Sequence, residues 1–265
     1  MDAILDSGST AARAQSAIEP AIAVEGLVKR YGDVVAVDGI GFTVARGSFT
    51  ALLGGNGAGK TTTIAILLGL IRPTAGHIRI LGQDFALHAK DLLARMNFQS
   101  PYADLPRRLT VRQNLTIYAR LYGVAKVKER IADLAHELDL AALLDRPFGE
   151  LSAGQRTRAG LAKAFINRPE LVLLDEPTAS LDPDTADWVR AFLARYAKEA
   201  GATFFIASHN MPEVERLCDQ VLMMKAGRIV DSGAPKELIA RYGRPTLEEV
   251  FLEVARHGAR SGDSP

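Results

Sequence analysis

The sequence has little cysteine, little net charge and no long apolar run. Cys218 is the single cysteine among 265 residues, so it can form no internal disulfide and cannot supply a zinc site by itself, which fits a reducing, cytosolic setting. The 32 Lys and Arg residues balance 31 Asp and Glu residues, and no run of one sign predicts a nucleic-acid or acidic-lipid surface. The longest useful apolar run, residues 64–71, is far shorter than the roughly 20 residues of a membrane-spanning helix, so we expect the chain not to cross a bilayer.

The first twenty residues do not have the pattern of a secretory signal. They are rich in Ala and Ser but carry Asp2 and Asp6 in place of a positive start and a continuous apolar segment. We expect this segment, and the tail from His257, to be disordered. Hydrophobic residues make up 48% of the chain and charged residues 24%, which is the composition of a globular protein with one or two domains.

The first part of the chain alternates in a way that predicts strands followed by a helix. Short β-branched segments in residues 21–49 indicate strands joined by tight turns, and hence an antiparallel edge. The turns are marked by Gly32, Gly39, Gly41 and Gly47. The run at 50–53 predicts a buried strand, and residues 61–70 predict a helix that ends at Arg72-Pro73.

The remainder predicts a helical insert and then alternating helices and strands. Residues 110–145 carry apolar side chains near helix spacing. After them we expect a helix from Ser152, a strand at 171–174, a helix from Pro183, a strand at 203–207 and a final series of strands and helices. Such alternation predicts an α/β fold with a parallel sheet that helices cover on both faces.

The octapeptide GGNGAGKT matches the phosphate-loop pattern G-x-x-x-x-G-K-[ST] in its required context, after an apolar strand and at the start of a helix. Its glycines let successive backbone N–H groups converge on phosphate oxygens, and the helix start adds its positive end. Lys60 indicates a bound polyanion, because a cation at a helix N-terminus is otherwise disfavoured. A glycine-rich turn before an ordinary helix is the structural alternative. The residues predicted to bind nucleotide here are Gly54, Gly55, Asn56, Gly57, Ala58, Gly59, Lys60, Thr61 and Thr62.

Two carboxylates follow the apolar strand in ELVLLDEP, residues 170–177. Ligands of parallel sheets lie at the carboxyl ends of the strands. We expect Asp175 to hold Mg²⁺ through water, Thr61 to supply a hydroxyl to the same ion, and Glu176 to act as a base or polariser for the attacking water. The alternative is a pair of acidic residues that cap a helix after a core strand.

The segment ELSAGQRTR, residues 150–158, begins an Ala-rich helix, and Ser152 and Gln155 stand at capping-box spacing. Its LSAGQ also resembles the LSGGQ signature of ABC transporter ATPases, in the family's order after the phosphate loop and before the acidic strand. Ala153 replaces the first glycine of the usual pair, and Gly55 stands where proline is common. The resemblance covers residues 24–233. It implies a P-loop NTPase core of the ABC type, with a mostly parallel sheet, an antiparallel β edge and an inserted helical subdomain.

The resemblance also implies that two subunits share each ATP. In the family, two copies dimerise head to tail, and the phosphate loop of one and the signature helix of the other hold the nucleotide between them. The signature would offer a second helix N-terminus to the γ-phosphate. The residues expected to act in this way across the dimer are Leu151, Ser152, Ala153, Gly154 and Gln155.

Four further residues match family positions, and each also has a plain structural interpretation. Gln99 corresponds to the glutamine loop, which contacts Mg²⁺ or the attacking water, although a lone glutamine is otherwise a surface residue. Asp182 resembles the aspartate loop at the dimer interface and is also a good helix cap before proline. His209 matches the switch histidine between the γ-phosphate and Glu176, although an isolated histidine is more often structural. Tyr31 resembles the aromatic that stacks on adenine, or is a strand aromatic facing the core.

The cofactors and partners follow from the resemblance. They are ATP and Mg²⁺, a second ABC ATPase subunit in a homodimer or pseudo-dimer, and an integral membrane permease, with no nucleic acid. The chain would then lie at the cytoplasmic face of the cell membrane. In the family the permease inserts a short cytosolic helix beside the glutamine loop, so we expect exposed apolar side chains at Phe98, Tyr102 and Leu105.

The C-terminal segment bears on the direction of transport. Residues 246–256, TLEEVFLEVAR, place one apolar stripe on a helix, which a plain amphipathic helix explains. The stripe consists of Leu247, Val250, Phe251 and Val254. LEEVFLEV also resembles the C-terminal helix of ABC ATPases that serve drug, lipid or polysaccharide exporters, and residues 116–124, TIYARLYGV, agree. We expect a disordered segment over 1–20, an ATPase domain over 21–240 with a helical insert at about 100–165, and a C-terminal helix and tail over 241–265.

Other functional classes stay open as alternatives. An importer subunit, or an ABC ATPase of translation or DNA repair, would carry many of the same motifs. The translation type has two cassettes, whereas one phosphate loop is present here, and the repair type has a long coiled coil, for which residues 61–151 leave no room. A GTPase would need an Asn-Lys-x-Asp motif, which is absent. A nucleotide-sensing protein that does not hydrolyse ATP would have another residue in place of Glu176, and Glu176 is present here.

Overall fold

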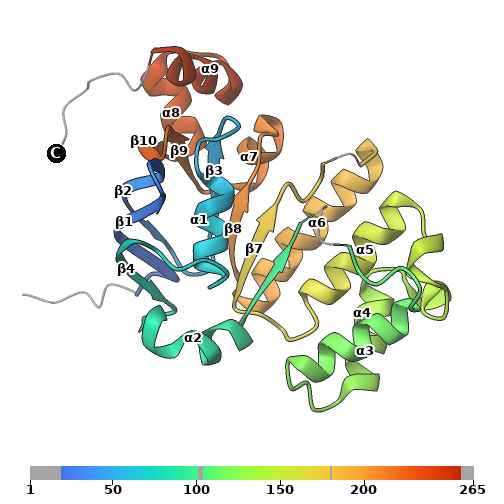
Figure 1. Ribbon diagram of the computed structural model, residues 1–265. Coiled ribbons are helices and arrows are strands. Elements are labelled where there is room, and N and C mark those ends of the chain that lie inside the picture. Colours follow the sequence, from blue (N-terminus) through green and yellow to red (C-terminus); the bar gives the residue numbers. More distant parts are fainter. Residues whose placement is uncertain (1–18, 101–103, 180, 258–265) are drawn as a thin grey trace, which may run out of the picture.

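The computed structural model describes residues 19–100, 104–179 and 181–257 (Figure 1). The disorder expected over residues 1–20 and from His257 falls mostly on residues 1–18 and 258–265, which lie outside the described residues. At His257 the expectation is wrong, because this residue ends a helix. Within the described ranges, each helix is too short or too polar to span a membrane.

A six-stranded sheet forms the centre of the molecule, in the order β10-β9-β3-β8-β7-β6. Strand β3 pairs in parallel with β8 and β9, and β7 pairs in parallel with β8 and β6, while β10 is antiparallel to β9. The strands are β3 (Phe49–Gly54), β6 (Met96–Gln99), β7 (Leu171–Asp175), β8 (Thr203–Ala207), β9 (Gln220–Lys225) and β10 (Arg228–Gly233). The predicted mostly parallel α/β sheet is confirmed.

Both faces of this sheet are buried. Successive side chains of a strand point to opposite faces, so neighbouring residues pack in different apolar clusters. On one face Leu52 packs in a cluster with Ile64 of α1 (Lys60–Leu67). On the other face its neighbours Ala51 and Leu53 belong to a second cluster. That second cluster is covered by α6 (Pro183–Ala200), α7 (Met211–Leu217) and α8 (Pro235–Tyr242). The carboxyl ends of β3, β7 and β8 are thus held between two apolar layers.

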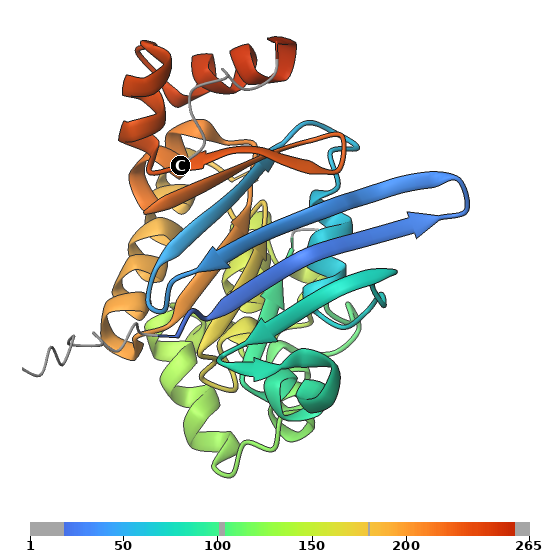
Figure 2. The same ribbon diagram turned by 90° about the vertical axis from the view of Figure 1, so that its left-hand side faces the viewer.

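The expected antiparallel edge is a sheet of its own, in the order β2-β1-β4-β5 (Figure 2). Its strands are β1 (Ile22–Tyr31), β2 (Val34–Val44), β4 (Ala75–Ile80) and β5 (Gln83–Asp84). It meets the central sheet where the Asp38 N–H donates to the Gly227 carbonyl at 2.8 Å. Gly39 and Gly41 lie inside β2, not in turns between strands as predicted, because the strand accommodates them at shifts of the β1–β2 register.

Helix α1 is shorter than predicted. It ends at Leu67, not at residue 70, because Gly69 adopts a left-handed φ of 68° well before Pro73. The sequence patterns also did not predict α2 (Phe85–Ala94), which begins where Asp84 accepts hydrogen bonds from the backbone N–H groups of Ala86 and Leu87.

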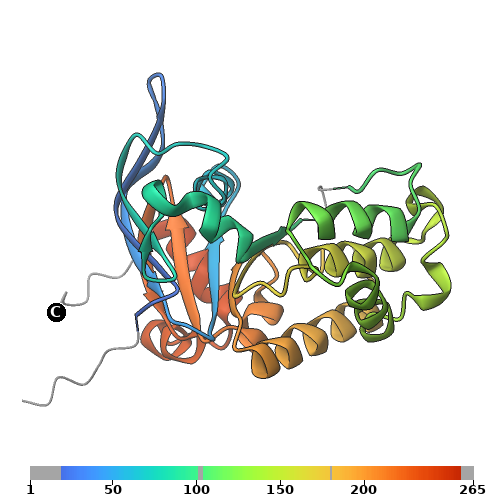
Figure 3. The ribbon, with the colours of Figure 1, turned by 90° about the horizontal axis from the view of Figure 1, so that it is seen from below.

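The helical insert lies to one side of the central sheet (Figure 3). It comprises α3 (Val111–Leu121), α4 (Val127–Glu137) and α5 (Ala153–Ala164), with short 3₁₀ turns at Ala141–Leu143 and Phe148–Glu150. Capping boxes begin α3 at Thr110 and α5 at Ser152, as the Ser152 and Gln155 spacing predicts for α5. Caps of this kind fix the residue at which each helix starts. They therefore place Ser152 at the N-terminus of α5.

The C-terminal helix α9 (Leu247–His257) uses the predicted apolar face. Leu247, Val250 and Val254 are buried, and Phe251 packs against the same cluster half-buried. The Leu247 N–H donates to the Glu215 carboxylate of α7 at 2.7 Å. The helix is thus docked on α7 and α8, and its Val254 carbonyl accepts from the Lys225 amine at the end of β9.

Candidate active site

The phosphate loop connects β3 to α1, and the glycines there serve two different purposes. A Cβ at Gly59, whose φ is 110°, would lie 2.5 Å from the Ala36 carbonyl, so packing and conformation both demand glycine. Gly55 and Gly57 face open space, with no atom within 4 Å of an added Cβ. The backbone between these two residues is therefore approachable by a ligand, as a phosphate cradle requires.

Lys60 begins α1 and carries the only charge in its first turn within the described residues. Its Nζ donates to the carbonyls of Gly54 at 2.6 Å and Gly55 at 3.2 Å. Burial lowers the pKa of Lys60, and the charges of Glu176 and Asp175 oppose that shift. The lysine of the loop and the two carboxylates after β7 thus share one electrostatic environment.

Asp175 ends β7 half-buried, beside the carboxyl end of β6. Burial and the neighbouring Glu176 raise its pKa, while Lys60 and a hydrogen bond from Ser100 lower it. Ser100 is itself 5% exposed. This is an environment in which a carboxylate gains from a nearby cation.

Glu176 and His209 form a close pair at the ends of β7 and β8. The His209 Nδ1 and the Glu176 Oε1 are 2.5 Å apart. Glu176 holds a left-handed φ of 51°, which is uncommon for a residue with a side chain, and its N–H donates to the Ala207 carbonyl at 2.8 Å. The glutamate side chain is largely buried and the imidazole is exposed, so the pair faces outward from the sheet.

The signature segment and the aspartate loop contact each other within the chain. The Ser152 Oγ accepts from the Gln155 N–H at 3.3 Å, while Asp182 caps α6 through the Thr185 N–H at 2.9 Å. A Cβ on Gly154 would lie 3.3 Å from the Thr185 hydroxyl. The starts of α5 and α6 therefore form one contiguous surface. Figures 1 and 3 place α5 and α1 on opposite sides of β7.

Comparisons with known proteins identify this arrangement. The family model described as ABC transporter matches residues 37–179. The chain is 39% identical over 258 residues to Nod factor export ATP-binding protein I of Ralstonia nicotianae, covering 92% of this chain and 80% of that protein. It is 36% identical to the daunorubicin resistance ATP-binding protein DrrA3 of Streptomyces coeruleorubidus, covering 91% and 77%.

The chain belongs to the ABC transporter family.

Solved structures agree with this assignment. The ATP binding subunit of an ABC transporter superposes with a TM-score of 0.80 at 27% identity, covering 88% of this chain and 98% of that one. The cbiO1 protein of Clostridium perfringens, described as part of the ABC transporter complex cbiONQ, gives 0.76 at 30% identity, covering 90% and 96%. This protein is therefore an ABC ATP-binding domain and an ATPase, as its motifs indicate.

The structure brings some of the predicted site residues of this ABC ATPase together and leaves others apart. Lys60, Asp175, Glu176 and His209 interact electrostatically or by direct contact. The signature residues do not join them within one copy. Tyr31 is 47% exposed at the turn between β1 and β2, with the Lys29 amine 4.9 Å from its ring centre, so the alternative of a core-facing aromatic is wrong.

Sequence reasoning missed two polar residues behind the Glu176–His209 pair. The Ser208 hydroxyl lies 3.5 Å from the Glu176 carboxylate and 3.4 Å from that of Glu213, and it accepts from the Asn210 N–H at 3.0 Å. Glu213 is 2% exposed, and burial raises its pKa. The position of Ser208 directly before the histidine was a usable signal, whereas a glutamate in a short helix gives no sign that it is buried.

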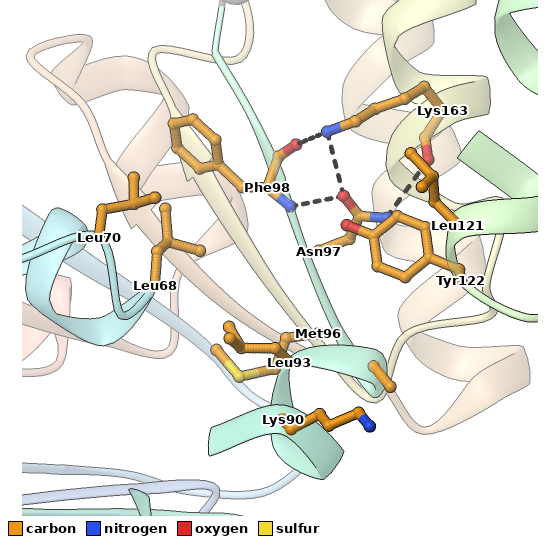
Figure 4. Close-up of a pocket in the computed structure, with 11 residues that line it drawn as sticks. Leu68, Leu70, Lys90, Leu93, Met96, Asn97, Phe98, Leu121, Tyr122 and Lys163 are labelled. Carbon is orange, nitrogen blue, oxygen red and sulfur yellow. Dashed lines mark hydrogen bonds between the residues drawn. The ribbon is translucent and has the colours of Figure 1, made fainter. Parts of the chain in front are cut away.

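A groove of about 510 Å³ lies between the core and the helical insert (Figure 4). Leu70 at the end of the α1 segment and Leu121 at the end of α3 line it and are 74% and 75% exposed. Phe98 lines it half-buried. Leu105 does not contribute an exposed side chain, contrary to expectation, because it is 4% exposed within the core of the insert, and Tyr102 lies outside the described residues.

Lys163 of α5 forms part of the groove wall and is largely buried. Its amine donates to the Asn97 Oδ1 at 3.2 Å and to the Phe98 carbonyl at 2.9 Å (Figure 4). Burial lowers the pKa of Lys163 to about 8. Both acceptors are neutral, and burial is the cause of the shift, with no carboxylate contributing to it among the described residues.

This environment predicts a pH-dependent stability. The unfolded chain holds the Lys163 proton up to its ordinary pKa of 10.5, while the folded chain releases it near 8, so the unfolded state binds more protons in between. Stability should therefore rise with pH by about 2 kcal/mol between about pH 8 and about pH 10 from this group alone. Urea unfolding of the wild type and Lys163→Met across that window measures the difference. Equal pH slopes for the two proteins would contradict the assignment.

Proposed function

We propose that this ABC ATPase energises the export of a substrate through a separate membrane permease, by closing as a dimer around ATP. The observation that carries the proposal is the cluster of Lys60, Asp175, Glu176 and His209 at the carboxyl ends of the central strands. Export is supported by the relatives, which are named for Nod factor export and for daunorubicin resistance. The docked apolar face of α9 is compatible with the same branch.

The phosphates would lie along the open backbone from Gly55 to Gly57, with Lys60 as the cation beside them. This lysine now donates to two backbone carbonyls, and a polyanion would be a stronger acceptor. Ala58 is buried and supports the loop from below, while Asn56 and Thr61 are exposed on its outer side. Tyr31 is exposed and therefore free to stack on a base.

The residues also fit a magnesium ion. Asp175 is a half-buried carboxylate whose pKa is raised by burial and by Glu176, which is the kind of group that a divalent cation stabilises. Thr61 would add its exposed hydroxyl, and Gln99 its amide oxygen. When bound, Mg²⁺ would neutralise charge on the phosphates.

Glu176 would take the proton of the attacking water. Its Oε1 is held by His209, and its backbone is held by Ala207, so the carboxylate has a defined direction before substrate arrives. The exposed imidazole of His209 would contact the γ-phosphate while it keeps Glu176 in place. The hydrolytic step would therefore be positioned by side chains of one copy.

A second copy would complete the site. The N-terminus of α5, with Ser152 and the Gly154 N–H, is a phosphate-binding end of a helix that lies away from Lys60 of its own chain. Head-to-tail pairing would bring it to the phosphate loop of the partner, with Asp182 at the same surface. The contact of Gly154 with Thr185 would then link both interface loops within each copy.

The groove beside β6 is proposed as the permease docking site, at the cytoplasmic face of the membrane. The exposed leucines of the groove allow a direct test by substitution. Leu121→Asp should abolish co-purification of the permease from membranes in mild detergent, because a carboxylate would be buried against an apolar surface. The ATPase activity of the purified subunit should stay within about twofold of wild type, since the change is remote from Lys60 and Glu176.

The matched control is Leu87→Asp, because Leu87 is 78% exposed on α2 and does not line the groove. It should leave the complex intact. Equal recovery of the permease with Leu121→Asp and with wild type would place the docking site elsewhere.

The companion of the wild-type protein tests the function itself. A companion with several membrane spans, identified by mass spectrometry after purification in mild detergent, supports transport. A ribosome or DNA in its place would overturn the proposal. Export, as opposed to import, requires ATP-dependent loss of substrate from cells that contain the complex, compared with cells that carry Glu176→Gln.

A further inference from the structure

The Gln99 side chain lies in a slot that exists because residue 160 has no side chain. Gln99 ends β6 and is 9% exposed. A Cβ placed on Gly160 of α5 would lie 2.6 Å from the Gln99 Nε2 and 3.1 Å from both its Cδ and its Oε1. The whole amide group therefore rests against the Gly160 backbone, at distances that any larger residue would forbid.

The conformation of the backbone does not explain glycine at this position. Gly160 lies in the middle of α5, a regular helix from Ala153 to Ala164, and it is not among the glycines with positive φ. Glycine weakens a helix interior relative to alanine. We therefore attribute the glycine at position 160 to the space that the Gln99 side chain occupies.

The slot belongs to a polar joint between β6 and α5. The Asn97 Nδ2 donates to the Lys163 carbonyl at 3.3 Å and to the Asn167 Oδ1 at 2.9 Å, and the Lys163 amine returns to Asn97 and Phe98. These contacts hold successive turns of α5 along the strand. Gly160 stands one turn before Lys163 and two turns after Ser152, on the helix whose start carries the signature.

In the slot, the Gln99 amide donates from Nε2 to the Ser100 carbonyl at 3.3 Å. Among the described residues it makes no hydrogen bond to Asp175 or Glu176. The Asp175 carboxylate takes its hydrogen bond from the neighbouring Ser100 instead. The Gln99 amide therefore rests on Gly160 and Ser100, while Ser100 also serves the Asp175 carboxylate.

We propose that Gly160 is a positioning residue that stores the Gln99 amide against the signature helix, so that the balance between slot and site controls the rate of hydrolysis. This inference rests on the proposed role of Gln99 in hydrolysis. A side chain at position 160 should displace the Gln99 amide from the slot toward the hydrolytic site beside Asp175. Because Gly160 acts through Gln99, whose proposed role is in hydrolysis, the change should appear in kcat and not in the KM for ATP.

The test is a double-mutant cycle in the full-length chain without permease. Gly160→Ala should raise kcat about two- to tenfold with an unchanged KM for ATP, and the same substitution in a Gln99→Ala background should change kcat by less than about 1.5-fold. Thr157→Ala is the control, because it raises the helix propensity of α5 one turn earlier without facing Gln99. Urea unfolding verifies that all five proteins, the wild type and the four variants, are folded.

The outcomes separate this inference from the proposed function. An effect of Gly160→Ala that persists in the Gln99→Ala background, or that Thr157→Ala reproduces, would refute the proposal that Gly160 acts through Gln99. A fall in kcat would overturn it too, because the slot would then be the productive position of Gln99. Absence of ATP hydrolysis in the wild type would instead refute the proposed function.

Discussion

Glu176→Gln is expected to lower kcat for ATP hydrolysis about 100- to 10,000-fold while ATP still binds, the usual range for the loss of a general base. Glutamine keeps the shape of the side chain and can still contact His209, but its amide cannot take a proton from water. The phosphate loop, the Lys60 amine and the signature are unchanged. ATP should therefore close the dimer and hydrolysis should no longer open it, so gel filtration with ATP and Mg²⁺ should show a stable dimer.

Glu215→Gln is the control for this substitution. Glu215 is an exposed glutamate on α7 that accepts from the Leu247 N–H, and a glutamine oxygen can keep that bond. Its kcat should match the wild type, with no dimer accumulating. If Glu176→Gln elutes only as a monomer with ATP, closure of two copies around the nucleotide is wrong, even if its kcat falls as expected.

Lys60→Met is expected to weaken ATP binding about 10- to 100-fold, because one charge-assisted hydrogen bond contributes about 1.5–3 kcal/mol. The lysine is placed at the start of α1 by Gly59, and its amine can leave the carbonyls of Gly54 and Gly55 for a phosphate. Methionine retains the length of the apolar stem and removes the charge. Titration of a fluorescent ATP analogue measures the loss of affinity.

Lys236→Met, an exposed position on α8, controls for a general loss of positive charge. ATP affinity equal to wild type in Lys60→Met would show that the loop binds nucleotide through its backbone alone. A loss of affinity in both variants would point to long-range electrostatics in place of a specific contact.

The residues predicted most accurately from the sequence are those whose role depends on near neighbours in the chain. The phosphate loop needs glycines, a lysine and a helix start within eight residues, and the structure places β3 and α1 around them as predicted. The capping boxes at Ser152 and the cap at Asp182 depend on contacts three residues away. Local spacing suffices for such features because their geometry is set within one turn of helix.

The features that sequence analysis missed depend on contacts between distant segments. The apolar pattern around Leu105 does not reveal that this side chain is buried in a core with α3, α4 and α5. Glu213 and Lys163 have polar side chains that are expected to face solvent, and only packing against other elements shows them to be buried. The same holds for the separate antiparallel sheet, whose strand β4 pairs with β1 across about fifty residues.

The amino-acid sequence was thus enough to indicate the family and the order of the strands and helices around the phosphate loop. It also indicated four candidate active-site residues, Lys60, Asp175, Glu176 and His209. The resemblance already paired His209 with Glu176, and the structure shows that contact, whereas the packing of Gln99 against Gly160 became visible only in the folded chain. The reason is physical. Hydrogen-bonded caps and loops are local, whereas Glu176 and Gln99 are positioned by partners that lie 33 and 61 residues away in the chain.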